Sequence, residues 1–139
     1  MANEAVLVFK LQEAIPFTVA NATGIEKGAV CKMTSPMTAI ISSANNDIIA
    51  GIAASEKVAS DGKTKLGIFR RGIFKMALSG LCTVGDPLCS TATAWPNYVN
   101  TAGTTMSGSK VLGFALETVS AASGTTCLVD LNIGVGGQA

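Results

Sequence analysis

The chain has 139 residues, of which 48% are hydrophobic and only 14% are charged. Ten Lys and Arg residues against nine Asp and Glu residues give a net charge of +1. This composition excludes an intrinsically disordered chain, which has few apolar residues and a high net charge, and it predicts a single domain over residues 1–139. The near-neutral charge gives no general attraction to nucleic acid, so nucleic acid is not an expected partner. No run approaches the roughly 18 consecutive apolar residues of a membrane span, so a membrane is not expected as a partner either.

Short apolar runs rich in β-branched residues follow one another along the chain, separated by Gly, Ser, Thr and Asn. Runs of this length between turn residues are typical of strands in a sandwich or barrel. Hairpin turns are expected at Ser60–Lys63 and Ala122–Thr125, because Asp-Gly and Ser-Gly supply a positive φ at low cost. We therefore expect an all-β protein with strands at Val6–Phe9, Ile15–Val19, Ala29–Met33, Met37–Ile41, Ile48–Ala53, Leu66–Phe69, Ile73–Leu78, Val111–Leu116 and Cys127–Val135.

One stretch of the sequence occurs twice in related form. GIAASEKVASDGKT at residues 51–64 is echoed by GFALETVSAASGTT at residues 113–126, with a second glycine eleven residues after the first in both. Upstream, residues 26–33 and 83–91 each place a glycine before a short apolar run that contains a cysteine. The small residues of the Gly-x-Ala strand predict a place where another backbone crosses closely.

The repeat divides the chain into two halves, at roughly residues 16–78 and 79–135, behind an extended N-terminal arm of residues 1–15. Each half reads strand, turn, Gly-x-Ala strand, hairpin, strand. Two such halves suit a small, closed or nearly closed β-barrel with internal pseudo-twofold symmetry, since closure removes the exposed edges of a sheet.

Catalytic and cofactor motifs are absent from the sequence. The chain contains no histidine, which excludes Ser-His, Cys-His and His-metal arrangements, and its carboxylates are scattered. Gly62-Lys63-Thr64 resembles the end of a phosphate-binding Walker A motif, but that motif needs a glycine at position 57, which is Lys57. We therefore expect a protein that is not an enzyme and that has no catalytic residues, cofactor or metal site.

The four cysteines have no CxxC spacing, so a zinc site is not expected. The prediction is that they are small, buried, reduced hydrophobic residues. A bridge between Cys82 and Cys89, or between Cys31 and Cys127, would form only in an oxidising setting.

Two features suggest contact surfaces. Five of the ten cations lie within thirteen residues, interleaved with apolar residues, at Lys63, Lys65, Arg70, Arg71 and Lys75. These cations could form a face that docks on an acidic protein surface, a nucleic-acid contact, or simply the solvated, edge-protected face of a hairpin. The only Trp and Tyr, Trp95 and Tyr98, lie in a long loop, where they could anchor a partner or plug the end of a barrel.

Three segments carry a family resemblance: IPFTVANATGIEKGAVCKM (15–33), DIIAGIAASEKVASDGKTKLGIFRRGIFK (47–75) and KVLGFALETVSAASGTTCLVDL (110–131). Together, in order and spacing, they closely resemble the small decoration, or cement, proteins of tailed-phage capsids. The resemblance covers about residues 14–133. The chain departs from the family pattern in two places. Cysteines replace the expected Leu or Val on strands, and the loop at 90–109 is more aromatic. These departures put individual contacts in question, but not the class of protein.

The resemblance implies a β-barrel or β-tulip module that binds outside an expanded icosahedral head and stabilises it. Members of such a family are typically trimers that clamp neighbouring major capsid protein subunits, with the N-terminal arm along the shell. For this chain the resemblance implies a homotrimer on the outer surface of the virion, assembled in the host cytoplasm. The arm would contact the capsid through Val6, Val8 and Leu11. A basic face would contact it through Arg70, Arg71 and Lys75.

Two other functions stay open at this point. A head-fibre or tail-associated structural protein would share the β-module and bind elsewhere on the particle. A small ligand-binding β-barrel would need a pocket with converging polar groups, and the lack of histidine makes it the weakest alternative.

Overall fold

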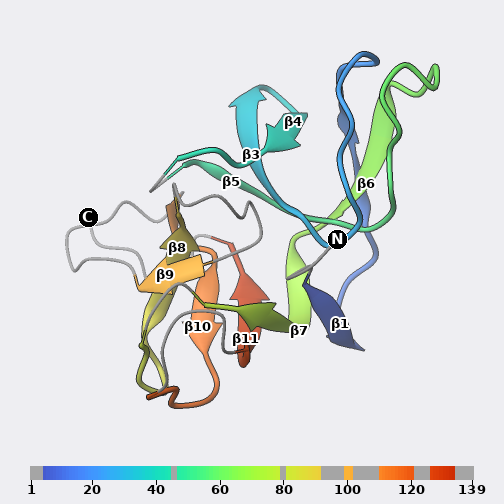
Figure 1. Ribbon diagram of the computed structural model, residues 1–139. Helices are drawn as coiled ribbons and strands as arrows, with labels where there is room; N and C mark the ends of the chain where they lie inside the picture. Colours follow the sequence, from blue (N-terminus) through green and yellow to red (C-terminus); the bar gives the residue numbers. More distant parts are fainter. Residues whose placement is uncertain are drawn as a thin grey trace.

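The computed structural model describes residues 5–44, 47–78, 81–91, 99–101, 110–120 and 126–133. The described ranges contain strands and turns but no helix of the length and apolarity needed to cross a membrane. The all-β prediction is therefore confirmed (Figure 1). The strands are β1 (Val6–Lys10), β2 (Ile15–Thr18), β3 (Val30–Ser35), β4 (Thr38–Ile41), β5 (Ile49–Ala53), β6 (Lys65–Phe69), β7 (Arg71–Ala77), β8 (Pro87–Ser90), β9 (Val99–Thr101), β10 (Gly113–Ala115) and β11 (Thr126–Asn132).

The strands form a closed five-stranded barrel and a six-stranded sheet. The barrel has the order β2-β4-β3-β5-β6, and the sheet has the order β1-β7-β11-β10-β8-β9. Figure 1 shows the barrel strands in the upper part of the view and the sheet below them. Only Arg70 lies between β6 and β7, so the chain passes from the barrel into the sheet within one residue.

The sequence repeat corresponds to a repeated set of strand pairings. Around the barrel, the order β2-β6-β5-β3-β4 matches β7-β11-β10-β8-β9 in the sheet. An isolated bridge between Ile25 and Lys57 in the first unit has its counterpart between Cys82 and Val119 in the second. The turns before β3 and β8 also correspond, because Gly28 and Gly85 have φ values of 81° and 89°. The duplicated element is therefore a complete five-strand unit.

The two units differ in closure. In the first unit β2 also pairs in parallel with β4, at Thr18 and Thr38, and the barrel is closed. In the second unit the free edge of β7 is taken by β1 instead. The sequence had suggested that both halves build one barrel together. The structure shows that the first half closes a barrel alone, with the unit boundary at Arg70.

Each repeated stretch begins with a glycine because the backbone of a neighbouring strand passes too close for a side chain. A Cβ at Gly51 would overlap the carbonyl oxygen of Phe69, and a Cβ at Gly113 would overlap that of Asp130. Gly51 also has a φ of 146°, which L-residues rarely adopt. The predicted close crossing at the Gly-x-Ala strand is thus observed in both units.

The Gly62-Lys63-Thr64 segment forms part of a turn. Gly62 has a φ of 86°, and the carboxylate of Asp61 accepts hydrogen bonds from the backbone N–H of Val58 at 3.1 Å and of Lys63 at 2.8 Å. The backbone N–H groups of Val58 and Lys63 are therefore satisfied by the Asp61 side chain of the turn itself. The corresponding turn at 122–125 lies largely outside the described residues.

The two units share a hydrophobic core. β5 is buried along its whole length because one face points into the barrel and the other packs against the second unit. Ile49 and Ile52 of β5 belong to the same cluster as Phe74 of β7 and Leu131 of β11. A second cluster, which includes Phe17 and Leu66, fills the barrel.

A polar link also joins the two units. Asp47 accepts hydrogen bonds at Oδ2 from the Ser42 hydroxyl and the N–H groups of Ser43 and Ala44, and its own N–H donates to the Ser90 hydroxyl of β8 at 3.0 Å. Burial alone would raise the pKa of the Asp47 carboxyl, but these hydrogen bonds and the charge of Lys32 together lower it. The loop before β5 is thereby tied to the sheet.

Candidate functional site

Exposed apolar side chains concentrate on β1. This strand pairs, among the described strands, with β7 alone, and all five of its residues are exposed. An edge strand of this kind offers unpaired backbone groups to a partner. The exposed fractions of its apolar residues and of the one that follows are 55% for Val6, 36% for Leu7, 42% for Val8, 61% for Phe9 and 61% for Leu11. We refer to these five residues as the β1 apolar edge.

The β1 apolar edge adjoins two of the predicted basic residues. Val6 is the register partner of Lys75, and Phe9 is the partner of Ile73, so these side chains share the outward face of the sheet. Arg71 and Lys75 are exposed on β7, while the alternating residues Gly72, Phe74 and Met76 are buried. The structure therefore joins the predicted arm and the predicted basic face into one surface.

Arg70 lies apart from that surface. Its guanidinium Nη1 donates a hydrogen bond to the carbonyl oxygen of Ala50 at 2.8 Å, and the side chain is half-buried. Desolvation, followed by the charge of Arg71, lowers the pKa of Arg70. This contact holds the junction between β6 and β7 against β5, so we assign Arg70 a structural contact in addition to its predicted one.

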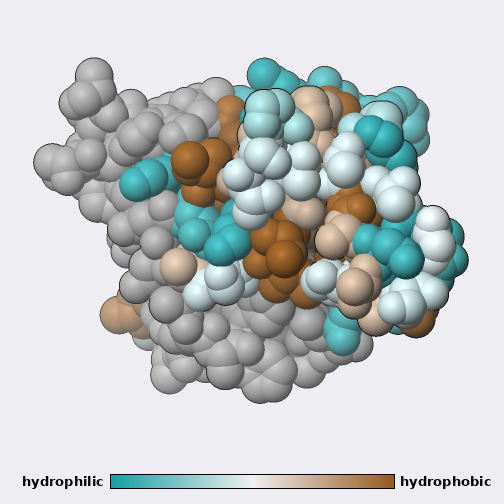
Figure 2. Space-filling view, turned by 90° about the horizontal axis from the view of Figure 1, so that it is seen from above, coloured by the Kyte–Doolittle hydropathy of each residue, from teal (hydrophilic) through white to brown (hydrophobic). Residues whose placement is uncertain are grey.

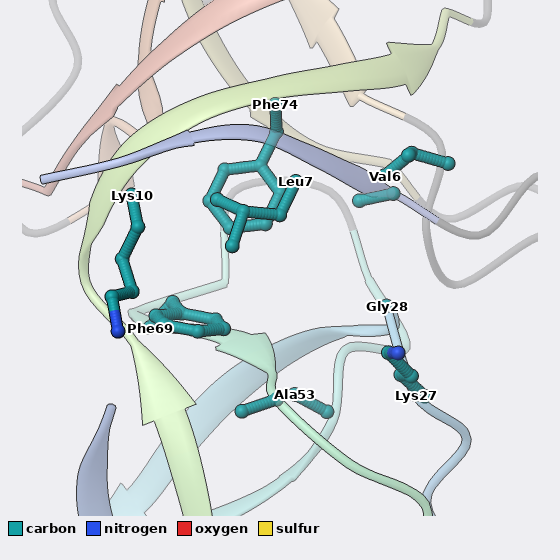
Figure 3. Close-up of a pocket in the computed structure, with 10 residues that line it drawn as sticks. Val6, Leu7, Lys10, Lys27, Gly28, Ala53, Phe69 and Phe74 are labelled. Atoms are coloured by element: carbon teal, nitrogen blue, oxygen red, sulfur yellow. The ribbon is translucent and has the colours of Figure 1, made fainter. Parts of the chain in front are cut away.

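A cavity of about 490 Å³ lies between β1 and the barrel. Its apolar side includes Phe69 and Phe74, whose ring centroids are 5.8 Å apart. Figure 3 shows Leu7 over Phe74 and places Lys10 and Lys27 on opposite sides of the cavity. The ammonium group of Lys10 is 2.8 Å from the Glu13 carboxylate in an exposed ion pair.

The start of β1 is fixed to the barrel. The Ala5 N–H donates to the carbonyl oxygen of Gly28 at 3.0 Å, and the Ala5 side chain is buried in the shared core. Within the predicted arm, residues 6–10 therefore form the edge strand β1 of the sheet, and Ile15 at its end begins the barrel strand β2. Because the backbone of β1 is held on one side, its free edge and exposed side chains are presented in a defined geometry.

The barrel end of the molecule mixes polar and apolar side chains. Seen from above, the described residues are coloured largely hydrophilic to intermediate, with groups of apolar side chains among them (Figure 2). Single exposed apolar residues such as Val58, at 60% exposure, are ordinary on protein surfaces. Four exposed apolar residues on one strand and a fifth just after it are not, and this concentration marks the β1 apolar edge as the candidate contact site.

The sequence named only part of this surface. It named Val6, Val8 and Leu11 by alternation. It missed Leu7, because an edge strand exposes both faces, and it missed Phe9, because a register shift between Leu7 and Phe9 interrupts the alternation. Trp95 and Tyr98, the predicted loop anchors, lie outside the described residues. Within the described ranges no group of three His, Cys, Asp or Glu side chains could hold a metal ion.

Comparison with solved structures supports the fold. The crystal structure of the head fiber gp8.5 N base in bacteriophage phi29 matches with a TM-score of 0.53 and 16% sequence identity, over 84% of this chain and 92% of that chain. At this identity the likeness concerns the fold alone. No curated protein matches the chain in sequence. The sequence model of the family described as phage cement protein matches residues 9–131.

Proposed function

The chain belongs to the phage cement protein family, and from that premise we propose that it binds the outer surface of an icosahedral phage head as an oligomer and stabilises the expanded shell. Family membership makes it a structural protein of the phage head. The proposal adds the position on the outer surface, the contact with the major capsid protein, and a role that involves no catalysis. Assembly onto the head would take place in the host cytoplasm, before lysis.

The observation that carries the proposal is the β1 apolar edge beside Arg71 and Lys75. An extended strand of a capsid subunit could pair with the free edge of β1, with affinity from main-chain hydrogen bonds and specificity from alternate side chains. The two cations add attraction to an acidic surface, and this attraction is screened at high salt. One basic and apolar surface would thus bind without a pocket or a reaction.

A homotrimer would strengthen the binding. Each subunit's contact can be weak, because three linked contacts raise the overall affinity by orders of magnitude. Cyclic oligomers also place the same surface on every subunit in equivalent positions, which suits a symmetric shell. Size-exclusion chromatography with light scattering checks this part directly: a trimer is expected, and a stable monomer that still binds heads would remove the oligomer from the proposal.

The binding itself is tested with expanded empty heads. The protein should sediment with the heads to saturation, and decorated heads should withstand a higher temperature before they release their subunits. Unexpanded heads serve as the control, since binding is expected only after expansion. Failure to sediment with expanded heads at any protein concentration would refute the proposal.

The fold likeness to a head fibre base favours one alternative, a fibre component attached at fewer sites on the head. The two functions differ in the number of copies on a particle. A cement protein covers the shell in a number comparable to that of the capsid subunits, whereas a fibre base occupies selected positions. Quantitative gel densitometry of purified virions, relative to the major capsid protein, distinguishes them.

A further inference from the structure

Two of the four cysteines are in contact. The sulfur atoms of Cys82 and Cys127 are 3.8 Å apart, and the two residues are 5% and 0% exposed. Cys127 lies on β11, and Cys82 lies in the isolated bridge with Val119, so the contact joins segments 45 residues apart in the sequence. The sulfur–sulfur contact differs from both pairings suggested by the sequence, Cys82 with Cys89 and Cys31 with Cys127.

The internal repeat shows which residues occupy the equivalent positions in the first unit. The bridge of Cys82 with Val119 corresponds to that of Ile25 with Lys57. On β11, Val129 faces Ala115 as Ile68 faces Ala53 in the first unit, so Cys127, two residues earlier, corresponds to Leu66. Ile25 and Leu66 are both buried in the barrel core. The second unit therefore has a thiol at both members of a pair that is purely apolar in the first.

Cys31 differs from the pair in its contacts rather than in its pKa, because burial also raises the pKa of Cys127, to about 11. The Cys31 thiol donates to the carbonyl oxygen of Ala29 at 3.6 Å, and burial raises the pKa of Cys31 to about 12. Such a thiol behaves as a small, inert hydrophobic group. Cys31 thus serves as an internal reference for a cysteine that fills space only.

Cys82 lines a pocket at the protein surface. A surface pocket of about 290 Å³ is lined by Cys82 together with Leu81, Thr83, Thr118 and Ser120. Cys127 does not line this pocket, and both thiols point toward the carbonyl oxygen of Glu117, at 3.5 Å and 3.7 Å. Cys82 is therefore the sulfur that an oxidant reaches first.

We propose that Cys82 and Cys127 form an intramolecular disulfide when the folded protein meets a small peroxide oxidant. The Cys82 thiolate attacks one oxygen of hydrogen peroxide; the O–O bond breaks, Cys82 becomes a sulfenic acid, and one water is formed. The Cys127 sulfur then attacks the Cys82 sulfur, the S–O bond breaks, and a second water leaves. Overall, two thiols and one peroxide give one disulfide and two waters. The sulfur atoms need to approach from 3.8 Å to about 2.05 Å.

The disulfide would tie β11 to the turn that precedes β8. It would close a covalent loop from residue 82 to residue 127 and restrict the unfolded chain, which raises the melting temperature by on the order of 10 °C. This site is independent of the proposed contact with the capsid. It gives the protein a covalent staple that forms after folding, once the reducing cytosol no longer surrounds the particle.

The test uses the purified full-length chain, treated with a small excess of hydrogen peroxide and quenched with catalase. The intact mass should fall by about 2 Da, for the two thiol hydrogens. The count of reactive thiols in denaturant should fall from four to two, and proteolysis without reductant should yield a peptide pair linking Cys82 to Cys127. The melting temperature should rise and return to its starting value on reduction.

Variants separate this pair from the other cysteines. Cys82→Ala and Cys127→Val should abolish the mass loss, and Cys31→Ala, the matched control, should leave it unchanged. Because the wild-type measurement needs no substitution, a variant that fails to fold does not decide the outcome. Four thiols after treatment, a linked pair other than Cys82 with Cys127, or a gain of oxygen atoms without a crosslink would overturn the proposal.

Discussion

Phe9→Ser tests the contribution of the β1 apolar edge to binding. Phe9 is 61% exposed and shares the outward face with Ile73. A phenylalanine side chain buries roughly 200 Å² when fully enclosed, so docking would cover about 120 Å² of it. At about 25 cal/mol per Å², this area corresponds to about 3 kcal/mol.

This free energy corresponds to an affinity loss of roughly 150-fold per subunit contact. The figure is an upper value, because docking also costs side-chain and backbone freedom. The stability of the free protein should change by less than about 0.5 kcal/mol, since the side chain is on the surface. Binding of labelled protein to expanded heads, measured by co-sedimentation over a concentration series, gives the affinity.

The matched control is Val58→Ser. Val58 is also an exposed apolar residue, at 60%, but it lies in a turn of the barrel away from β1. Its substitution should leave the affinity within twofold of wild type. A twofold change corresponds to about 0.4 kcal/mol and lies within the measurement error expected of such an assay. If Phe9→Ser binds as well as wild type, or if both variants lose affinity equally, the β1 apolar edge is not the contact surface.

Three further predictions concern the fold. Gly113→Ala should destabilise the protein by about 2 kcal/mol or more in urea unfolding, because its Cβ would overlap the Asp130 carbonyl, whereas Gly24→Ala meets only ordinary contacts and should cost about 1 kcal/mol or less. Lys57→Met should cost about 1 kcal/mol, because the ammonium group's hydrogen bonds to the carbonyl oxygens of Asn21 and Val58 and its ion pair with Asp61 are lost while both carbonyls keep a backbone N–H donor, and thermal melts of the variant measure this loss. The lowered pKa of Asp47 contributes stability above the unfolded pKa of about 3.9, and this contribution is lost as the pH falls through the lower folded pKa. Asp47→Asn should therefore be less stable than wild type at pH 7, with a difference that shrinks in melts below about pH 4; a constant difference would contradict the assignment.

Local patterns in the sequence were sufficient to predict most of the strands. Each of the nine predicted apolar runs overlaps a strand of the structure, because short β-branched runs between turn residues have few alternatives. β8 lies within the repeated segment at 83–91, and β9 lies within the aromatic loop at 90–109, so neither strand was among the nine predicted runs. The duplicated glycines, Gly51 and Gly113, were also interpreted correctly as sites of close backbone approach.

Long-range pairing was not predictable from these patterns. The pairing of Val6 with Lys75 joins residues far apart in the sequence, and the parallel pair Thr18 and Thr38 that closes the barrel has no local signature. The sequence therefore identified the repeat but not which half closes. It likewise identified the apolar arm but not its place as an edge strand beside the basic residues.

Buried polar groups escaped sequence reasoning for the same reason. Lys57 looks like an ordinary surface residue between Glu56 and Val58. Its burial depends on oxygen atoms of Asn21, Val58 and Asp61, which meet only in the folded chain. The contact of Cys82 with Cys127 is similar, since spacing alone suggested other pairs.

The most direct test of the proposed function is an electron cryo-microscopy reconstruction of expanded heads saturated with the protein. We expect density for the protein over the outer surface of the shell, with β1 as the strand nearest the major capsid protein and Arg71 and Lys75 facing it. Density confined to a vertex or the tail, or a bound orientation in which β1 faces solvent while the barrel turns contact the shell, would contradict this function and this contact surface.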